Sequence, residues 1–345
     1  MKIAFLDRDC TLIWEPPDTQ QIDSLDRLRI LPGVLDGLKR LQNDGYALVM
    51  VSNQNGIGTP SFPEPAFREP QEEFLRLLAL EGVTFTEIFV CPHLSEDGCE
   101  CRKPKTGLVR EFLQNPEINF AESLMVGDRE TDAQFAQAVG VRSIRMQTNV
   151  AFPRFASVHR KTNETDARVL VNMDGSGSSE ISTGIGFLDH MLDLLAKHAL
   201  IDLTVNMTGD LRVDEHHTVE DTALALGAAL SKALGDKRGI ERYGFILPMD
   251  EALVEVAVDL SGRPYFVFDG NFTREFVGEL PTELVSHFFE SFAQSLRCTL
   301  HMTIKRGRNE HHKIEALFKG LGRCLRQAFR QSSYEQGIPS TKGSL

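Results

Sequence analysis

A pattern of potential metal ligands, H-H-x-x-E, occurs twice in this chain, at His216–Glu220 and at His311–Glu315. Each copy follows an amphipathic run with one further histidine, His190 before the first and His287 before the second. The two copies are 95 residues apart and the two further histidines 97, which predicts an internal duplication. On a helix, the first His and the Glu share a face. Adjacent histidines diverge by about 100° and can face two different metal ions.

The duplicated set offers six imidazoles and two carboxylates, enough for two ions with three imidazoles and one carboxylate each. Its members are His190, His216, His217, Glu220, His287, His311, His312 and Glu315. This mixture of nitrogen and oxygen ligands suits Mn, Fe, Co, Ni or Zn and argues against Ca. A single copy can arise by accident on a polar helix, whereas two copies in register favour a metal site.

Polar residues follow three short apolar runs in the first half of the chain. Asp7 and Asp9 come after the run 3–6, Ser52 after the run 46–51, and Asp128 after the run 124–126. Such runs, alternating with helical segments, predict a parallel, doubly wound sheet. Ligands bind at the carboxyl edge of such sheets, so we expect these side chains to lie together.

This arrangement resembles the haloacid dehalogenase (HAD) superfamily of aspartyl phosphohydrolases. Its motifs stand here as D-x-D-x-T at 7–11, Ser52, Lys103 before a helix, and G-D-x-x-x-D at 127–132. The resemblance implies that Asp7 is a nucleophile forming an aspartyl-phosphate and that Asp9 is the general acid and base. It implies Mg²⁺ held by Asp7, Asp128 and the backbone carbonyl of Asp9. The residues expected to bind the substrate and its phosphoryl group are Thr11, Ser52, Asn53, Arg102 and Lys103. Cys10 stands where the family usually carries glycine.

A further ligand pattern, C-x-H-x5-C-x-C, consists of Cys91, His93, Cys99 and Cys101. Three thiolates and one imidazole form a closed tetrahedral zinc site, which favours a structural ion over a catalytic one with an open position. Unligated buried cysteines are the remaining alternative. We expect zinc to fix a long loop that delivers Arg102 and Lys103 to the phosphate. This loop and its R-K-P resemble the histidinol-phosphate phosphatase subgroup, and the short segment between Thr11 and Leu31 favours a small phosphate monoester as substrate.

The second half resembles imidazoleglycerol-phosphate dehydratases over essentially its whole length. The matching segments are R-K-T-N-E-T at 160–165, F-L-D-H-M-L at 187–192, D-E-H-H-T-V-E-D at 214–221, H-H-K-I-E at 311–315 and S-T-K-G at 340–343. The resemblance implies a di-manganese site that accepts electron density from the substrate, with Glu164 as the candidate proton carrier. Substrate or phosphate contacts are implied for Lys197, His198, Arg242, Arg263, Lys319, Ser340, Thr341 and Lys342. Asp189 and Asp221 are expected to accept hydrogen bonds from imidazole N–H groups.

Taken together, the two halves resemble bifunctional histidine-biosynthesis proteins that join histidinol-phosphatase to this dehydratase. The resemblance implies hydrolysis of L-histidinol phosphate and dehydration of D-erythro-imidazoleglycerol phosphate, both small phosphorylated imidazole compounds. It also implies a homo-oligomer, a 24-subunit shell of the dehydratase domain with metal sites shared between subunits. A rival interpretation is a metal-storage or metal-sensing protein fused to an aspartyl-phosphate receiver. That interpretation leaves Asp9, Glu164 and the terminal S-T-K-G without a role.

The expected fold class is α/β. We expect a HAD-like doubly wound parallel sheet in residues 1–156, followed by a duplicated α/β sandwich like domain 2 of ribosomal protein S5 in residues 157–345. The duplicated halves are expected at roughly 160–250 and 251–345, each with strands, a helix, a strand and a final helix that begins at a histidine motif. Residues 151–158, with Pro153 and no periodicity, are expected to form the linker.

The composition limits the class of protein. The 345 residues are 41% hydrophobic and 25% charged, as in a globular protein of two domains. The net charge of -12 argues against a nucleic-acid surface or binding to an anionic membrane. The first residues do not resemble a signal peptide, and no apolar run approaches the roughly 18 residues of a spanning helix. Because half of the six cysteines cluster in a metal pattern, we expect a cytoplasmic protein.

Overall fold

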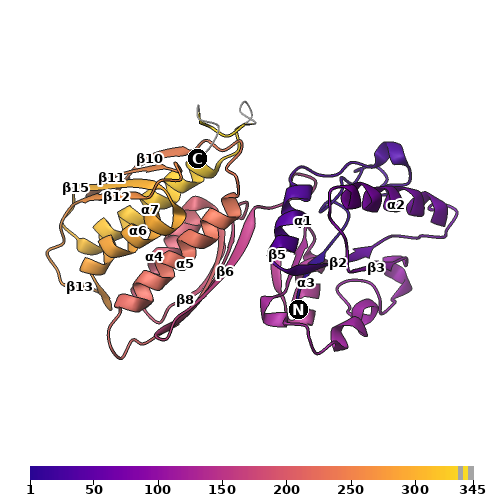
Figure 1. Cartoon of the computed structure of the whole chain (residues 1–345), viewed down its shortest axis with the longest axis horizontal. Helices are drawn as coiled ribbons and strands as arrows, with labels where there is room; N and C mark the ends of the chain where they lie inside the picture. The colour runs from indigo at the N-terminus through magenta and orange to yellow at the C-terminus, as the bar shows by residue number, and fades with distance from the viewer. Residues whose placement is uncertain (333–336, 341–345) are drawn as a thin grey trace. The chain divides into compact units, whose positions relative to one another are not determined.

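The computed structural model describes residues 1–332 and 337–340. The chain divides into two compact units, Met1–Pro153 and Arg154–Leu345, at a boundary three residues before the expected one. Each unit has its own sheets and helices (Figure 1). Among the described residues, no helix combines the length and apolar character needed to cross a membrane.

The first unit is built on a five-stranded parallel sheet with the strand order β3-β2-β1-β4-β5. Its strands are β1 (Lys2–Leu6), β2 (Tyr46–Asn53), β3 (Glu87–Cys91), β4 (Leu124–Gly127) and β5 (Arg142–Arg145), and its helices are α1 (Val34–Asn43), α2 (Glu64–Leu80) and α3 (Glu130–Val139). β1 lies in the centre, between β2 and β4. The predicted parallel sheet is confirmed, and its order sets the carboxyl ends of the three predicted strands side by side.

The central strands are apolar because helices cover the sheet. Ile3, Phe5, Val49 and Met125 are fully buried in one core cluster, and the ring of Phe5 packs edge-on against Phe135 of α3, with centroids 5.8 Å apart. Between β3 and β4 the chain forms four short 3-10 turns and no α-helix. This irregular stretch carries the cysteine pattern, and the packed strands beneath it form a fixed platform.

The second unit contains two four-stranded sheets with corresponding strand orders, β6-β7-β9-β8 and β10-β11-β15-β12. The first half consists of β6 (Phe155–Lys161), β7 (Thr165–Asn172), β8 (Ser179–Ser182), α4 (Gly186–Ala199), β9 (Asp202–Gly209) and α5 (His216–Leu234). The second consists of β10 (Tyr243–Met249), β11 (Ala252–Asp259), β12 (Tyr265–Asp269), α6 (Glu283–Leu296), β15 (Thr299–Arg306) and α7 (Glu310–Phe329), with an added hairpin of β13 (Phe276–Val277) and β14 (Leu280–Pro281). In each sheet one edge pair is parallel, β8 with β9 and β12 with β15. The predicted α/β sandwich is confirmed, and the matching strand orders support its duplication.

The four helices lie between the two sheets and pack across the halves (Figure 1). α5 of the first half packs on α6 of the second, and α4 packs on α7. Gly227 in α5 and Gly322 in α7 stand at the same distance from the first histidine of their motifs. A Cβ atom would lie 2.8 Å from the carbonyl oxygen of Phe292 at the first glycine, and 2.8 Å from that of Leu195 at the second. The two halves therefore form one core, because the helices of each half pack against their own sheet and also against the helices of the other half.

The expectation that residues 151–158 form a linker is wrong from Phe155 onward, because Phe155 begins β6 and pairs with Asn172 of β7. Arg154 is also fixed, with Nη2 2.6 Å from Asp174 Oδ1 and Nη1 donating to the carbonyl of Phe329. The strand was missed because its side chains show no clear alternation of apolar and polar residues.

Candidate active sites

Three buried carboxylates meet at the carboxyl ends of β1 and β4. Asp7 follows β1, Asp128 follows β4, and Asp132 lies in the first turn of α3, with oxygen atoms of all three within 4.8 Å of one another. Lys103, from the loop after β3, places Nζ 2.7 Å from Asp7 Oδ1 and 2.6 Å from Asp132 Oδ1. The structure thus brings Asp7, Asp128 and Lys103 together as the sequence predicts. It adds Asp132, which the last position of G-D-x-x-x-D could have indicated.

The cluster keeps an excess of negative charge. Burial, and then the charge of Asp7, raises the pKa of Asp128 and raises that of Asp132 to about 6. Burial lowers the pKa of Lys103, but the charges of Asp7 and Asp132 outweigh this and hold that pKa above its ordinary value. Lys103 therefore stays cationic, and the carboxylates around it remain available to a divalent cation.

The donor set fits a magnesium ion. Oδ1 of Asp128 is buried and has no hydrogen-bond partner among the described residues, while its other oxygen accepts a 2.9 Å hydrogen bond from Thr148 Oγ1. A buried acceptor without a partner is costly, and carboxylate oxygens are the ligands that Mg²⁺ prefers. Asp7 and Asp128 are the residues that would hold the ion.

Asp9 lies in a buried polar network beside the nucleophile candidate. Arg8 Nη1 donates to its Oδ1 at 2.6 Å, and Gln54 Nε2 donates to its Oδ2. The same Gln54 nitrogen donates to Ser52 Oγ at 2.8 Å, so one amide joins the candidate acid and base to the candidate phosphate ligand. Burial raises the pKa of Asp9 although the charge of Arg8 opposes it. A raised pKa favours the protonated form that a general acid needs.

Among the other residues expected to bind substrate, Asn53 contacts the backbone of Lys103. Asn53 Oδ1 accepts from the backbone nitrogen of Lys103 at 2.9 Å, and its Nδ2 donates to the backbone oxygen of Lys103 at 3.2 Å. Both amide functions thus hold the lysine in place. Thr11 is fully buried. Arg102 donates from Nη1 to the carbonyl oxygen of His93 at 3.0 Å and so lies against the cysteine loop.

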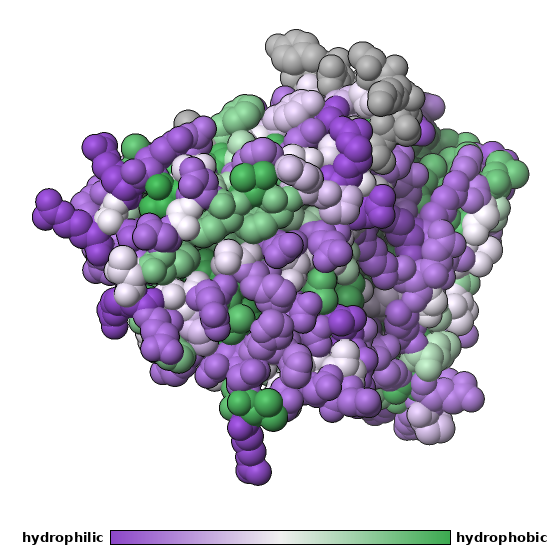
Figure 2. Space-filling model, turned by 60° about the vertical axis from the view of Figure 1, so that its left-hand side comes forward, coloured by the Kyte–Doolittle hydropathy of each residue, from purple (hydrophilic) through white to green (hydrophobic). Residues whose placement is uncertain are grey.

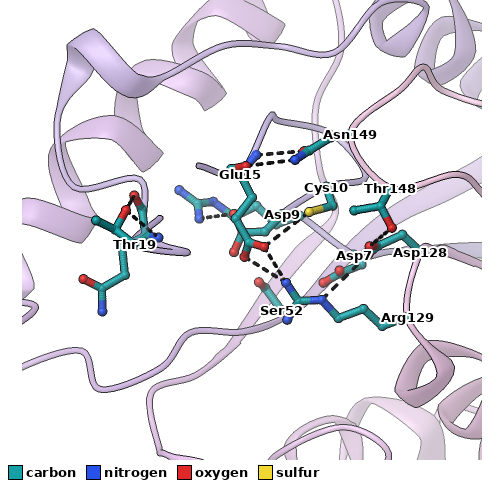
Figure 3. Close-up of polar contacts among 12 residues, drawn as sticks. Asp7, Asp9, Cys10, Glu15, Thr19, Ser52, Asp128, Arg129, Thr148 and Asn149 are labelled. Carbon is teal, nitrogen blue, oxygen red and sulfur yellow. Dashed lines mark hydrogen bonds and ion pairs between the residues drawn. The ribbon is translucent and has the colours of Figure 1, made fainter. Parts of the chain in front are cut away.

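Glu15 joins the groups at the edge of this site (Figure 3). Its carboxylate oxygens accept from Arg129 Nη2 at 2.7 and 2.8 Å, and one also accepts from Cys10 Sγ at 3.3 Å. The backbone of Glu15 exchanges two hydrogen bonds with the side chain of Asn149. Cys10 has a φ of 60°, the left-handed conformation that favours glycine. Glu15 was missed because a single charged residue between motifs carries no spacing signal, and Arg129 because it stands at a variable position of G-D-x-x-x-D.

The cysteine pattern comes together as a compact ligand set. Ligand atoms of Cys91, His93, Cys99 and Cys101 all lie within 4.8 Å of one another. Cys91 Sγ lies 3.1 Å from Cys101 Sγ and 3.7 Å from Cys99 Sγ, and His93 Nδ1 lies 3.1 Å from Cys101 Sγ. Thiolate and imidazole ligands around one point fit tetrahedral zinc. Cys91 ends β3, and Lys103 follows Cys101 by two residues, so the site fixes the approach of the lysine.

In the second unit, the first histidine of the first motif joins a histidine from the other half. His216 Nε2 lies 3.8 Å from Glu220 Oε2, and His287 Nε2 on α6 lies 3.9 Å from Glu220 Oε1. The rings of His216 and His287 are tilted, with centroids 4.7 Å apart. His287 Nε2 is buried and has no hydrogen-bond partner in the described part of the chain. These three side chains fit a divalent transition metal, and the packing of α5 on α6 makes the set.

The second motif has a corresponding arrangement. His311 Nε2 lies 3.5 Å from Glu315 Oε2, and the ring of His190 on α4 lies 6.1 Å from that of His311. Lys319, one turn further along α7, places Nζ 2.5 Å from Glu315 Oε1. The backbone nitrogen of His311 donates to the side chain of Asn309, which caps the helix. This cap helps to fix the histidine pair at the first turn of α7.

The second histidine of each pair faces a carboxylate. His217 stands nearly perpendicular to His216, and its Nδ1 lies 3.4 Å from Asp210 Oδ1. His312 is likewise perpendicular to His311, and its Nδ1 lies 2.7 Å from Glu251 Oε2. Hydrogen bonding to these carboxylates, only partly offset by burial, raises the pKa of both His217 and His312.

The expectation for Asp189 and Asp221 is wrong. Asp189 accepts from the backbone and hydroxyl of Thr183, at 2.8 and 2.5 Å. Asp221 accepts from Arg160 Nε at 2.7 Å and from Thr165 Oγ1. The carboxylate partners of the imidazoles lie in loops outside the helices: Asp210 precedes His217 by seven residues and Glu251 precedes His312 by 61.

Glu164 stands in the turn between β6 and β7, and its side chain is exposed. Thr162 Oγ1 accepts from the backbone nitrogens of Glu164 and Thr165 at 3.2 and 3.0 Å. Since Thr165 donates to Asp221 on α5, the turn is tied to the helix that carries the first histidine pair. The charge of Glu164 contributes to the raised pKa of His217.

The candidate phosphate ligands are spread over several elements. Arg242 forms a two-pronged ion pair with Asp259, at 2.5 and 2.9 Å, and donates to the carbonyl of Pro339 next to Ser340. Arg263 and Lys197 are exposed in a loop and at the end of α4. Burial, and then the charge of Lys319, lowers the pKa of His198. Thr341 and Lys342 lie outside the described residues.

The comparisons with known proteins agree with both units. A family model described as imidazoleglycerol-phosphate dehydratase matches residues 183–325, and one described as HAD-hydrolase-like matches residues 100–169. The crystal structure of imidazoleglycerol-phosphate dehydratase from Pyrococcus furiosus is 39% identical, covers 55% of this chain and 100% of that chain, and has a TM-score of 0.48.

Two relatives match the chain from end to end. The histidine biosynthesis bifunctional protein HisB of Actinobacillus pleuropneumoniae is 47% identical over 99% of this chain and 98% of that protein. The protein with the same description from Legionella pneumophila is 48% identical over 100% of this chain and 99% of that protein. The chain therefore belongs to the family of histidine biosynthesis bifunctional proteins, enzymes that combine a HAD-type phosphatase unit with an imidazoleglycerol-phosphate dehydratase unit.

Proposed function

We propose that the first unit hydrolyses L-histidinol phosphate and that the second dehydrates D-erythro-imidazoleglycerol phosphate. The observation that carries this proposal is the presence of two separate constellations, each contained within one unit. Asp7, Asp128 and Lys103 meet at one sheet edge, and the histidine–glutamate sets gather where α5 and α7 begin. Family membership does not favour the alternative of a metal-storage protein fused to a phosphate receiver.

In the phosphatase unit, Asp7 is the nucleophile that attacks phosphorus and forms an aspartyl-phosphate. Asp9 gives its proton to the leaving alcohol and then takes one from the attacking water. Lys103 and Ser52 hold phosphoryl oxygens and offset their charge, and Asn53 keeps Lys103 in position. Mg²⁺, held by Asp7 and Asp128 with the backbone carbonyl of Asp9, supplies a further positive charge on the phosphoryl group when bound.

In the dehydratase unit, Glu164 carries the proton removed from carbon. Its turn is tied through Thr165 and Asp221 to α5, the helix that begins with the first histidine pair, and its side chain is exposed. The histidine and glutamate sets would hold manganese, which would stabilise negative charge that develops on the substrate's imidazole. Lys319, Arg242, Arg263, Ser340, Thr341 and Lys342 are proposed to bind the phosphate, and Lys197 and His198 to contact the substrate.

We propose that the manganese sites are completed between subunits. The first set in one chain has three candidate ligands, His216, Glu220 and His287. His217 and His312 face carboxylates with rings turned about 90° from their neighbours, which leaves them available to a different copy. A shell of 24 chains, as the dehydratase resemblance implies, would bring such ligands together. Much of the surface seen in Figure 2 is hydrophilic with scattered apolar areas.

The cysteine set is proposed to bind zinc and to have a structural role, since it has four protein ligands and no open position. Thiolates that bind zinc must stay reduced, and Cys91, Cys99 and Cys101 form no disulfide in the structure. A reducing compartment, the cytoplasm, suits this chemistry.

The two activities are tested on one purified protein. Asp7→Asn and Glu164→Gln are assayed against both substrates, with metal content measured in each. The proposal expects each variant to lose one activity and to keep the other. Loss of both activities in either folded variant contradicts the assignment of one site to each unit.

A further inference from the structure

The duplication puts a glutamate at the corresponding place in each half of the second unit. The turn between β6 and β7 ends at Glu164, immediately before β7, and the turn between β10 and β11 ends at Glu251, immediately before β11. Each turn is joined to the helix that carries a histidine pair. The first is tied to α5 through Thr165 and Asp221, and in the second Glu251 Oε2 lies 2.7 Å from His312 Nδ1 on α7. The two glutamates are therefore positional counterparts.

The environments of these counterparts differ. In the first half, His217 Nδ1 already faces Asp210, the residue directly after β9, at 3.4 Å. The residue directly after β15 is Gly307, which has no side chain to offer. In the second half, the carboxylate that accepts the hydrogen bond from the imidazole of His312 is therefore Glu251, in the turn between β10 and β11. In the first half Asp210 has this position, and Glu164 remains exposed.

Glu251 is also held rigidly. Its Oε1 accepts from the backbone nitrogens of Asn309 and Arg308, at 3.0 and 3.3 Å, in the loop that leads into α7. An ionised carboxylate only accepts hydrogen bonds, so His312 Nδ1 must carry the proton of the 2.7 Å contact. The lone pair of Nε2 is then free for a metal ion, and the ring cannot rotate without losing the bond.

We propose that Glu251 is a positioning residue for metal binding, which fixes the tautomer and ring direction of His312, while its counterpart Glu164 is left for proton transfer. The inference rests on the proposed function in one respect, that the histidine sets bind manganese. The inference adds that the two corresponding glutamates, Glu251 and Glu164, have different roles.

The test measures the affinity of the full-length protein for Mn²⁺ alone, by following the electron paramagnetic resonance signal of the free ion during a titration. In Glu251→Gln the side chain keeps one oxygen for the two backbone N–H groups but presents an NH₂ donor to His312. Mn²⁺ affinity at one of the two sites per chain should fall about 10- to 100-fold. Asp250→Asn, which removes the same charge from the same exposed turn, should bind within about twofold of wild type.

A variant of the corresponding glutamate in the first half, Glu164→Gln, is a second control for the Mn²⁺ titration. Glu164→Gln should keep wild-type Mn²⁺ affinity and lose dehydratase activity, whereas Glu251→Gln should regain much of its activity at saturating Mn²⁺. Equal affinities for Glu251→Gln and Asp250→Asn overturn the inference. So does a Glu251→Gln protein that binds Mn²⁺ normally yet is inactive, because Glu251 would then act on the substrate.

Glu251→Ala separates the metal role from the loop contact. It should lose both thermal stability and Mn²⁺ affinity, since the backbone bonds of 308 and 309 go with the carboxylate. If Glu251→Ala loses stability alone, the inference is overturned, and the only role of Glu251 is to hold the loop before α7. A wild-type protein that binds no Mn²⁺ overturns the proposed function and this inference together, whereas the other results affect the inference only.

Discussion

Lys103 bridges Asp7 and Asp132 in a buried site, and this contact makes the nucleophile part of a fixed network. Asp7→Asn keeps the shape of the side chain but removes the attacking carboxylate. We expect phosphatase activity to fall by roughly 10³-fold or more, because the neighbouring carboxylate, Asp9, is already bonded to Arg8 and Gln54. Dehydratase activity should stay close to wild type, since the two units have separate cores. Assays of both reactions at equal enzyme concentration check this, and a shared loss would contradict it.

Cys10 adopts a left-handed backbone conformation with a side chain attached. Cys10→Gly and Cys10→Ala both remove the thiol and its bond to Glu15, but only glycine relieves the backbone. We expect the glycine variant to be more stable than the alanine variant by about 1 kcal/mol. Denaturant unfolding followed by the fluorescence of Trp14, the chain's one tryptophan, reports on the first unit. Equal stabilities would show that the backbone at this position carries no strain.

At the scale of elements, the loop between β3 and β4 depends on its ligand set for order, because it contains short 3-10 turns and no α-helix. Cys99→Ser should reduce bound zinc to near zero and lower phosphatase activity by releasing Lys103 from its approach to Asp7. Glu100→Gln, at an exposed position between two ligands, is the matched control and should change neither. Zinc is measured by elemental analysis. A zinc-free variant with full activity and stability would show that zinc has no structural role in this loop.

The close packing of α4 on α7 depends on a glycine at position 322. In Gly322→Ala the new Cβ meets the backbone of Leu195 and Ala199, which cannot move alone, whereas in Gly320→Ala it meets the methyl groups of Val256 and Val254. We expect Gly322→Ala to cost roughly 1–3 kcal/mol and to weaken Mn²⁺ binding, because the crossing sets His190 relative to His311. Gly320→Ala should cost less, since a side chain can shift. Thermal unfolding and Mn²⁺ titration compare the two, and equal effects would argue against a tight crossing.

The elements that were predictable are those with a local pattern. Apolar runs between helical segments gave β1, β2 and β4, and the duplicated histidine motifs marked the starts of α5 and α7. The imidazole partners were not predictable, because Glu251 precedes His312 by 61 residues and only the folded hairpin brings them together. The same reason hid Gln54 as the link between Asp9 and Ser52. Asn53 was recognised as part of the site, but its use in holding Lys103 depends on a loop whose path no periodicity describes.

At the scale of the whole molecule, metal should determine assembly. If each manganese joins His216, Glu220 and His287 of one chain to a histidine of another, ion binding stabilises the oligomer by mass action. Treatment with a chelator at neutral pH should dissociate the particle, and Mn²⁺ should restore both its size and its dehydratase activity.

Sedimentation with and without chelator measures this, on wild type and on His217→Ala. The variant should remain small even with Mn²⁺, while Asp7→Asn should assemble as wild type does. Stripped wild type and His217→Ala that both stay at full size would show that apolar subunit contacts hold the particle.

The exchange of helices between the halves of the second unit bears on how such a protein could arise. Because α5 packs on α6 and α4 on α7, a single ancestral copy would have left one side of its helices uncovered and its metal ligands incomplete. Two identical chains, related by a twofold axis, would have covered each other's helices and completed each other's metal ligands. Fusion of the two genes then freed each copy to vary, and the strand-end positions occupied by Asp210 and Gly307 are one place where the descendants of that symmetric pair have diverged.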